Sequence, residues 1–278
     1  MCRWLAYSGP ALRLDAILFK PENSLIQQSL RAQRSRSVTN GDGFGVGWYS
    51  DHPHPGVFRD IHPAWNDENL RNLAEQIRAR LFFAHVRAST GTSTSRSNCH
   101  PFRHGDWLFM HNGQIGEFEK IRRELAFTVR PDLFASMKGA TDSEMFFYLA
   151  IGEGLEDDPP GALSRAINIV EAARTTAGIS EPFLLTAALT NGRTTYAVRY
   201  GSEGDAPSLY YGTDLPLAEM VTQDRGENIV ELDDPSDAAI LILSEPLDDI
   251  EDKWTEVPPG HIVIAEENRA YVLPFSLQ

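Results

Sequence analysis

The chain has 278 residues, of which 42% are hydrophobic and 23% are charged, a balance typical of a soluble globular protein that can bury a core. Its formal net charge of −14 argues against a general affinity for nucleic acid or for an anionic membrane surface. The sequence contains no apolar run of about 18 residues that could span a bilayer, and its N-terminal segment lacks the long apolar core that is typical of a secretory signal. Because only two cysteines occur, we expect a reducing, cytoplasmic location.

The first half of the chain is rich in strand-like runs. Residues 3–7, 43–49, 81–87 and 107–111 combine apolar, β-branched and aromatic residues in the way that predicts strands. One helix is predicted over residues 68–80, because four apolar side chains fall on one helical face: Leu70, Leu73, Ala74 and Ile77. In the strand 43–49, glycine at every second position predicts a bare face that another backbone or a ligand approaches closely.

The second half adds helices and further strands. A capping box at residues 141–144 predicts the start of a helix, and the apolar spacing over 161–174 predicts another. The dipeptide Asn191-Gly192 separates two strand-like runs and predicts a hairpin, because both turn residues tolerate positive φ. Further predicted strands cover residues 238–243, 261–265 and 269–272. Many strands, few helices and no regular βαβ alternation predict an α+β fold, with antiparallel sheets covered by helices, in one domain over residues 1–278.

Cys2 is the first candidate for chemistry. It directly follows the initiator methionine, and cysteine is small enough for that methionine to be removed. The released α-amine, whose pKa is about 7.7–8.0, is suited to take the proton of the thiol near neutral pH. A free cysteine at this position can equally be a small hydrophobe with no chemical role.

Two further motifs end predicted strands. In residues 85–90, Arg87 offers a planar, bidentate fork for a carboxylate, or else it forms a structural ion pair. In residues 110–113, the Asn112 amide and the Gly113 N–H are suited to stabilise an oxyanion, although Asn-Gly commonly marks only a tight turn.

Three other patterns also contain candidate functional residues. Asp142 is suited to face a ligand ammonium, and it also belongs to the predicted cap. The glycines of residues 40–48 do not form a phosphate loop, because no strand precedes them and the Lys-Ser/Thr pair is missing. The spacing of four candidate zinc ligands matches no usual structural zinc pattern: Cys99, His100, His104 and His111. We therefore expect neither a metal nor another cofactor.

In this order and spacing, the motifs resemble those of the class II glutamine amidotransferases, whose glutaminase domain begins with a catalytic cysteine. The resemblance covers nearly the whole chain, through Cys2, Asn40-Gly-Asp-Gly-Phe-Gly, His85-Val-Arg-Ala-Ser-Thr, Asn98-Cys-His-Pro, His111-Asn-Gly, Thr141-Asp-Ser-Glu, Leu243-Ser-Glu-Pro-Leu and residues 254–260. It implies the N-terminal-nucleophile hydrolase fold, a four-layer αββα sandwich of two antiparallel sheets. The short stand-alone subgroup that the chain resembles includes the γ-glutamyl amidohydrolase of ergothioneine biosynthesis.

The resemblance also implies roles for seven residues. Cys2 would be the nucleophile with its α-amine as base, while Asn112 and Gly113 would form the oxyanion hole. Four residues would bind the substrate: Arg87, Thr90, His100 and Asp142. Of these, Arg87 would hold the α-carboxylate and Asp142 the α-ammonium. Ala88 and Gly91 depart from the Trp and His-Gly that many amidotransferases carry here, so the resemblance does not define the pocket lid.

From this resemblance we expect an amidohydrolase that cleaves glutamine or a γ-glutamyl compound through a thioester on Cys2. The alternatives are a glutaminase subunit that delivers ammonia to a separate synthase partner, a non-catalytic ligand-binding or scaffold member of the fold, and a metal-dependent hydrolase. The expected ligand is a small molecule, with no nucleic acid or membrane partner. A synthase partner and a homo-oligomer both remain open.

Overall fold

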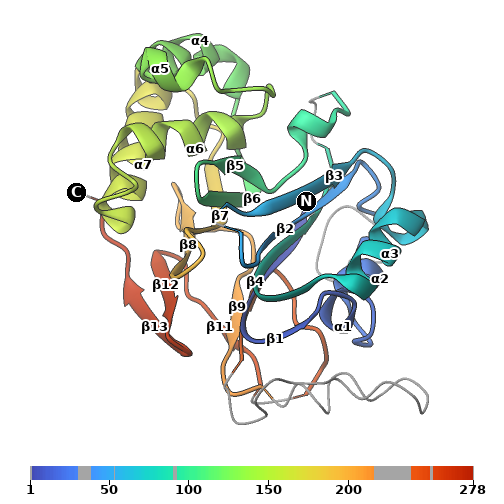
Figure 1. The fold of residues 1–278 in the computed structure, drawn as a ribbon. Coiled ribbons are helices and arrows are strands. Elements are labelled where there is room, and N and C mark those ends of the chain that lie inside the picture. Colours follow the sequence, from blue (N-terminus) through green and yellow to red (C-terminus); the bar gives the residue numbers. More distant parts are fainter. Residues whose placement is uncertain are drawn as a thin grey trace.

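The protein folds into two antiparallel sheets that pack face to face, with helices over both outer faces (Figure 1). The computed structural model describes residues 2–30, 39–52, 54–89, 93–215, 239–250 and 253–277. This arrangement confirms the expected α+β class and the four-layer αββα sandwich. None of the helices in these ranges has the length and apolar content that a membrane span requires.

In the described residues, the first sheet has seven strands in the order β11-β9-β10-β1-β4-β2-β3. Their bounds are β1 (Arg3–Arg13), β2 (Phe44–Tyr49), β3 (Gly56–Asp60), β4 (Arg78–Val86), β9 (Tyr210–Gly212), β10 (Ile240–Leu243) and β11 (Thr255–Glu256). The second sheet has six strands in the order β13-β12-β8-β7-β6-β5. Their bounds are β5 (Phe102–His104), β6 (Trp107–Ile115), β7 (Phe183–Thr190), β8 (Thr195–Gly201), β12 (His261–Glu266) and β13 (Arg269–Pro274).

Two groups of helices cover the sheets (Figure 1). The first sheet is covered by α1 (Asp15–Leu18), α2 (Leu25–Leu30) and α3 (Glu68–Gln76). The second sheet is covered by α4 (Phe118–Thr128), α5 (Pro131–Phe134), α6 (Asp142–Gly152) and α7 (Pro159–Thr176). Short 3-10 turns are η1 (Ala64–Asn66) and η2 (Arg96–Asn98).

Three apolar clusters lie between the four layers. The central cluster joins the inner faces of the sheets and contains Trp4, Phe83 and Met110, all at most 1% exposed. The helix α6 contacts β6 on one side and α4 and α7 on others, and its residues from Ser143 to Ala150 are all buried. A helix that is apolar on every face is stable only inside a protein, so α6 holds its N-terminal turn rigidly against the second sheet.

Three sequence predictions of local structure were wrong in detail. The helix predicted over 68–80 ends at Gln76, because Ile77 has an extended backbone and the chain enters β4 at Arg78. The Asn191-Gly192 hairpin forms, but its loop has four residues, and only Gly192 has a positive φ. The Asn112-Gly113 pair is not a turn, because β6 continues through it and pairs with β7 as far as Ile115.

Candidate functional site

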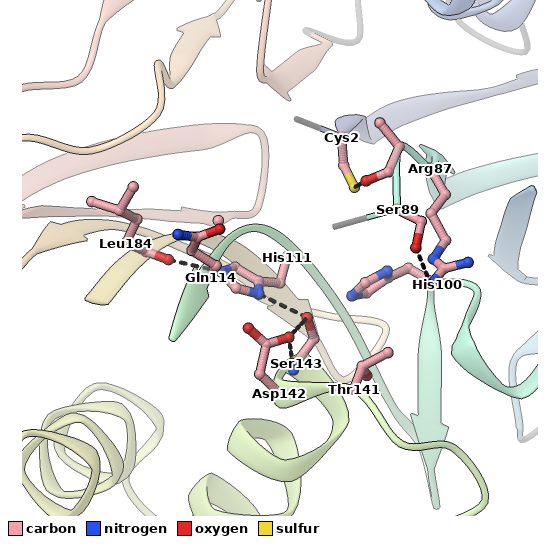
Figure 2. Close-up of a pocket in the computed structure, with 12 residues that line it drawn as sticks. Cys2, Arg87, Ser89, His100, His111, Gln114, Thr141, Asp142, Ser143 and Leu184 are labelled. Carbon is pink, nitrogen blue, oxygen red and sulfur yellow. Dashed lines mark hydrogen bonds between the residues drawn. The ribbon is translucent and has the colours of Figure 1, made fainter. Parts of the chain in front are cut away.

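A cavity opens where the ends of strands from both sheets meet the first turn of α6. Cys2 directly precedes β1 and Arg87 directly follows β4, and the neighbouring pair Arg3–Val86 is in register, so the antiparallel ladder brings Cys2 beside Arg87. Figure 2 shows these two residues on one side of the cavity, with His111, Ser143 and Asp142 on the other. The lining residues are Cys2, Arg87, Ala88, Ser89, His100, His111, Gly113, Gln114, Thr141, Asp142, Ser143 and Leu184.

The surroundings of the Cys2 thiol favour its protonated form. Its Sγ lies 3.6 Å from the carbonyl oxygen of Ala88. Burial raises the pKa of Cys2, and the charge of Asp142 raises it further, while the Ala88 contact and the Arg87 charge act in the opposite direction. Because burial is the largest of these effects, the thiol needs a base before it can attack.

Arg3, the residue after Cys2, is held by the C-terminal part of the chain. Arg3 and Glu245 are 1% and 2% exposed, and their Nε and Oε2 atoms are 2.9 Å apart. Arg3 Nη1 also donates to the carbonyl oxygen of Cys2 at 3.1 Å, and the Trp4 N–H donates to Ser244 Oγ at 3.2 Å. This buried ion pair fixes the backbone that carries the candidate nucleophile.

Arg87 is positioned by the glycine-rich segment before β2. Its side chain is 4% exposed and donates to Asp42 O at 3.4 Å and to Ser89 Oγ at 3.2 Å. The Asp42 carboxylate in turn accepts the Ser89 N–H at 2.7 Å, and the Arg87 N–H donates to Gly43 O at 2.8 Å. The guanidinium is therefore held in one orientation at the edge of the cavity.

The glycines of β2 have the bare face that their spacing predicts. A side chain at Gly45 would collide with the backbone oxygen of His100, and one at Gly47 would meet Leu108 and Pro101. This close approach lets the segment that carries His100 lie directly across β2.

Asn112 and Gly113 lie on opposite faces of β6. Gly113 lines the cavity with a φ of +149°, and a Cβ there would collide with the backbone oxygen of Leu184, so only glycine fits. The Asn112 side chain is 1% exposed and does not line the cavity. Its amide nitrogen and oxygen have no hydrogen-bond partner among the described residues, which is unusual for a buried amide.

Asp142 links α6 to β6. Its carboxylate accepts the Ile115 N–H at 2.9 Å and the Ser143 N–H at 2.7 Å. The N-cap of the helix is Thr141, whose hydroxyl accepts the Glu144 N–H at 3.1 Å. The reciprocal half of the predicted capping box is absent, because Glu144 accepts from two backbone N–H groups before Thr141 instead.

Three buried histidines surround the cavity in their neutral form. The rings of His85 and His100 stack with their centroids 4.2 Å apart. Burial lowers the pKa of His85 to about 3, and it also lowers the pKa values of His100 and His111. His111 lies with Nε2 3.1 Å from Leu184 O and Nδ1 2.8 Å from Ser143 Oγ. Because a carbonyl can only accept, the network assigns the proton of neutral His111 to Nε2.

The cavity brings together five of the seven predicted site residues: Cys2, Arg87, His100, Gly113 and Asp142. Asn112 lies behind the wall, and Thr90 falls outside the described residues. Sequence reasoning assigned no site role to Asp42 or Ser89, and it considered His111 only as a zinc ligand, although all three stand in the quoted motifs.

The four candidate zinc ligands do not gather. Within the part of the chain that the structure describes, the group with metal-ligand spacing is Asp60, His62 and Asp67. Asp60 already forms an ion pair with Arg96 at 2.7 Å, and His62 is largely exposed.

Comparisons with known proteins identify relatives that are named as glutamine amidotransferases or as a γ-glutamyl hydrolase. The model of a protein family described as class II glutamine amidotransferases matches residues 19–273. The Saccharomyces cerevisiae protein named probable glutamine amidotransferase DUG3 is 35% identical over 99% of this chain and 84% of its own length. The γ-glutamyl-hercynylcysteine sulfoxide hydrolase of Mycolicibacterium smegmatis is 26% identical over 99% of this chain and 100% of its own.

Two solved structures share the fold. A glutamine aminotransferase class-II domain protein from Silicibacter pomeroyi superposes with a TM-score of 0.72, at 34% identity and over 99% of both chains. The glutamine phosphoribosylpyrophosphate amidotransferase of Bacillus subtilis gives a TM-score of 0.65 at 13% identity, over 99% of this chain and 50% of that one. At 13% identity, the similarity to the Bacillus subtilis enzyme shows a shared fold and nothing further.

Proposed function

Since the chain belongs to the class II glutamine amidotransferases and is an amide hydrolase of that kind, we propose that it cleaves the side-chain amide of glutamine or a γ-glutamyl amine through a thioester on Cys2. The observation that carries this proposal is the position of the Cys2 thiol beside Arg87 and across one cavity from Asp142. The Arg87 guanidinium and the Asp142 carboxylate on either side of the thiol match the α-carboxylate and the α-ammonium of a free amino acid. We also propose that residues 1–278 form a single catalytic domain.

In the proposed first step, the α-amine of Cys2 takes the thiol proton, and sulfur forms a bond to the amide carbon. The oxyanion is stabilised by the N–H of Gly113, which lines the cavity. Asn112 lies behind the cavity wall, and its amide nitrogen has no hydrogen-bond partner among the described residues, so this amide would have to turn toward the cavity to add a second donor. When the C–N bond breaks, the α-ammonium returns its proton to the leaving nitrogen. The products of this step are a γ-glutamyl thioester and ammonia or an amine.

In the second step, water attacks the thioester carbon and gives a proton to the α-amine. The C–S bond then breaks, glutamate is released, and the proton returns to the Cys2 sulfur. No external oxidant or reductant is needed. The mechanism requires a free amine at Cys2, so we expect the active protein to begin at that residue.

The test is a screen of glutamine and several γ-glutamyl amines, with glutamate release as the readout and intact mass to identify protein that begins at Cys2. Cys2→Ala should abolish release, because no other group supplies the nucleophile. Cys99→Ser is the matched control, because Cys99 is buried against Asp60 O and Ser95 O and does not line the cavity. Full activity in protein that retains Met1 would exclude the amine as base.

A further inference from the structure

A second cavity lies between the exposed edges of the two sheets. β3 is the edge strand of the first sheet and β5 is the edge strand of the second, and the connection from α5 to α6 borders the space beside them. Its volume of about 630 Å³ is within the range of small-molecule sites, roughly 300–1,000 Å³. It shares no lining residue with the cavity around Cys2.

Positive charge gathers in this outer cavity, although the chain as a whole carries a formal charge of −14. Arg59 reaches it from β3, Arg103 from β5, and Lys138 from the α5–α6 connection. In the described ranges, none of these three cations forms an ion pair with a carboxylate. Three cations from three separate segments therefore face one space.

Arg59 is the most enclosed of the three. Its stem crosses Gly45, where an added Cβ would lie only 2.7 Å from Arg59 Cγ. Nη1 donates to Cys99 O at 3.2 Å, and this is the one hydrogen bond of the guanidinium within the described residues. Burial lowers the pKa of Arg59, which means that water solvates its charge poorly there. A partly desolvated guanidinium with free N–H groups favours a bound anion.

Among the described residues, Glu144 is the one carboxylate that lines the outer cavity, and both of its oxygens already accept hydrogen bonds. Oε1 accepts the Lys138 N–H at 3.0 Å, and Oε2 accepts the Gly139 N–H at 2.6 Å. Tyr148 supports the same connection, because its hydroxyl donates to Ser136 O at 3.1 Å. Glu144 therefore holds the backbone that presents Lys138. It forms no ion pair with the side chain of Lys138 or Arg59, although its negative charge still favours the protonated form of Arg59 and so opposes the lowering of that pKa by burial.

We propose that the outer cavity is a binding site for a small polyanion, carrying phosphate groups or several carboxylates, with Arg59 and Lys138 as its main contacts and Arg103 at its rim. Arginine supplies planar N–H pairs that match phosphate and carboxylate oxygens, and lysine supplies a mobile point charge. The site does not depend on the proposed chemistry at Cys2.

Titration calorimetry on the full chain carrying Cys2→Ala tests the site, because that protein cannot contribute catalytic heat. Pyrophosphate and citrate are the probes. We expect one of them to bind saturably, and Arg59→Met and Lys138→Met each to weaken it by at least about tenfold, as for loss of a charge-assisted contact. Binding of pyrophosphate alone identifies a phosphorylated ligand, and binding of citrate alone identifies a polycarboxylate.

Arg269→Met is the matched control, because it removes the same charge from the exposed start of β13, at the opposite edge of the second sheet. The affinity should remain unchanged in this variant. Failure of both probes to saturate at millimolar concentration would overturn the site, as would equal weakening by Arg269→Met. If Arg59→Met fails to fold, Lys138→Met decides, because Lys138 is exposed.

Discussion

The two cavities differ in how their charged side chains are used. Around Cys2, Arg87 and Asp142 are already bonded to the protein, and the space is only about 70 Å³. In the outer cavity, Arg59 and Lys138 form no ion pair with a carboxylate of the described residues, and the space is about nine times larger. Charges that the protein holds in fixed positions suit the recognition of one substrate in one orientation, whereas cations without an ion-pair partner suit a ligand that supplies the neutralising charge.

The strongest test of this difference is the removal of the Arg87 guanidinium, the cation that the protein holds in place beside Cys2. Arg87→Ala should lower kcat/KM on glutamine by at least about tenfold, because a charge-assisted contact of 1.5–3 kcal/mol is lost and 1.4 kcal/mol is one decade. Arg87→Lys should lose nearly as much, because it keeps the charge without the fork. Steady-state glutamate release is the measurement, with butyramide as a substrate lacking both charged ends. If both variants remain fully active and butyramide is cleaved as well as glutamine, Arg87 does not hold a carboxylate.

Removal of the Asp142 carboxylate should have a smaller effect on activity and should also affect stability. Asp142→Asn should raise KM several-fold and also lower Tm, because an amide cannot accept both the Ile115 and Ser143 N–H groups that the carboxylate accepts. Losing one such bond costs about 1–2 kcal/mol of unfolding free energy. Asp158→Asn is the matched control, since Asp158 accepts the Gly161 N–H at the start of α7, away from the cavity. An equal change in KM for both variants would remove Asp142 from substrate binding.

The smallest expected effect concerns the stacked histidines and pH. Because burial lowers the pKa of His100, protons bind the unfolded chain more readily than the folded one below about pH 6.5. The contribution of neutral His100 to the free energy of unfolding should therefore be complete above that pH and should fall as the pH drops toward the pKa of His100 in the folded state. The loss is at most about 1.4 kcal/mol per pH unit for each such histidine. His100→Phe keeps a stacked ring without the titrating group. Its Tm should fall less between pH 7 and pH 5 than that of the unchanged protein, and an identical slope would contradict this.

The parts of the fold that the sequence predicts are those with a local pattern. The strands around Cys2 and Arg87, the capping Thr141 and the hairpin at Gly192 each carry a signal within a few residues. The pair Asn112-Gly113 misleads, because a glycine that permits a close approach within a strand has the same sequence signature as a glycine in a turn. Helix α4 was not predicted, although Phe118, Ile121 and Leu125 follow helical spacing.

The remaining features depend on contacts that no local pattern reveals. β3 and β5 are short edge strands, so they carry little periodic signal, and their meeting at one side of the molecule creates the outer cavity. Asp42 positions Arg87 across 45 residues of sequence. The predicted catalytic residues were recognisable because several motifs occurred together, whereas Arg59 and Lys138 belong to no motif.

The ion pair between Arg3 and Glu245 also bears on when the surroundings of Cys2 are completed during synthesis. Its partners are 242 residues apart, and β1 cannot be fully paired until β10 has left the ribosome. Contacts of such long sequence separation form late in folding. β4 can pair with one edge of β1 early in synthesis, but the other edge of β1, and with it the Arg3–Glu245 pair beside Cys2, is completed only when the chain is nearly finished.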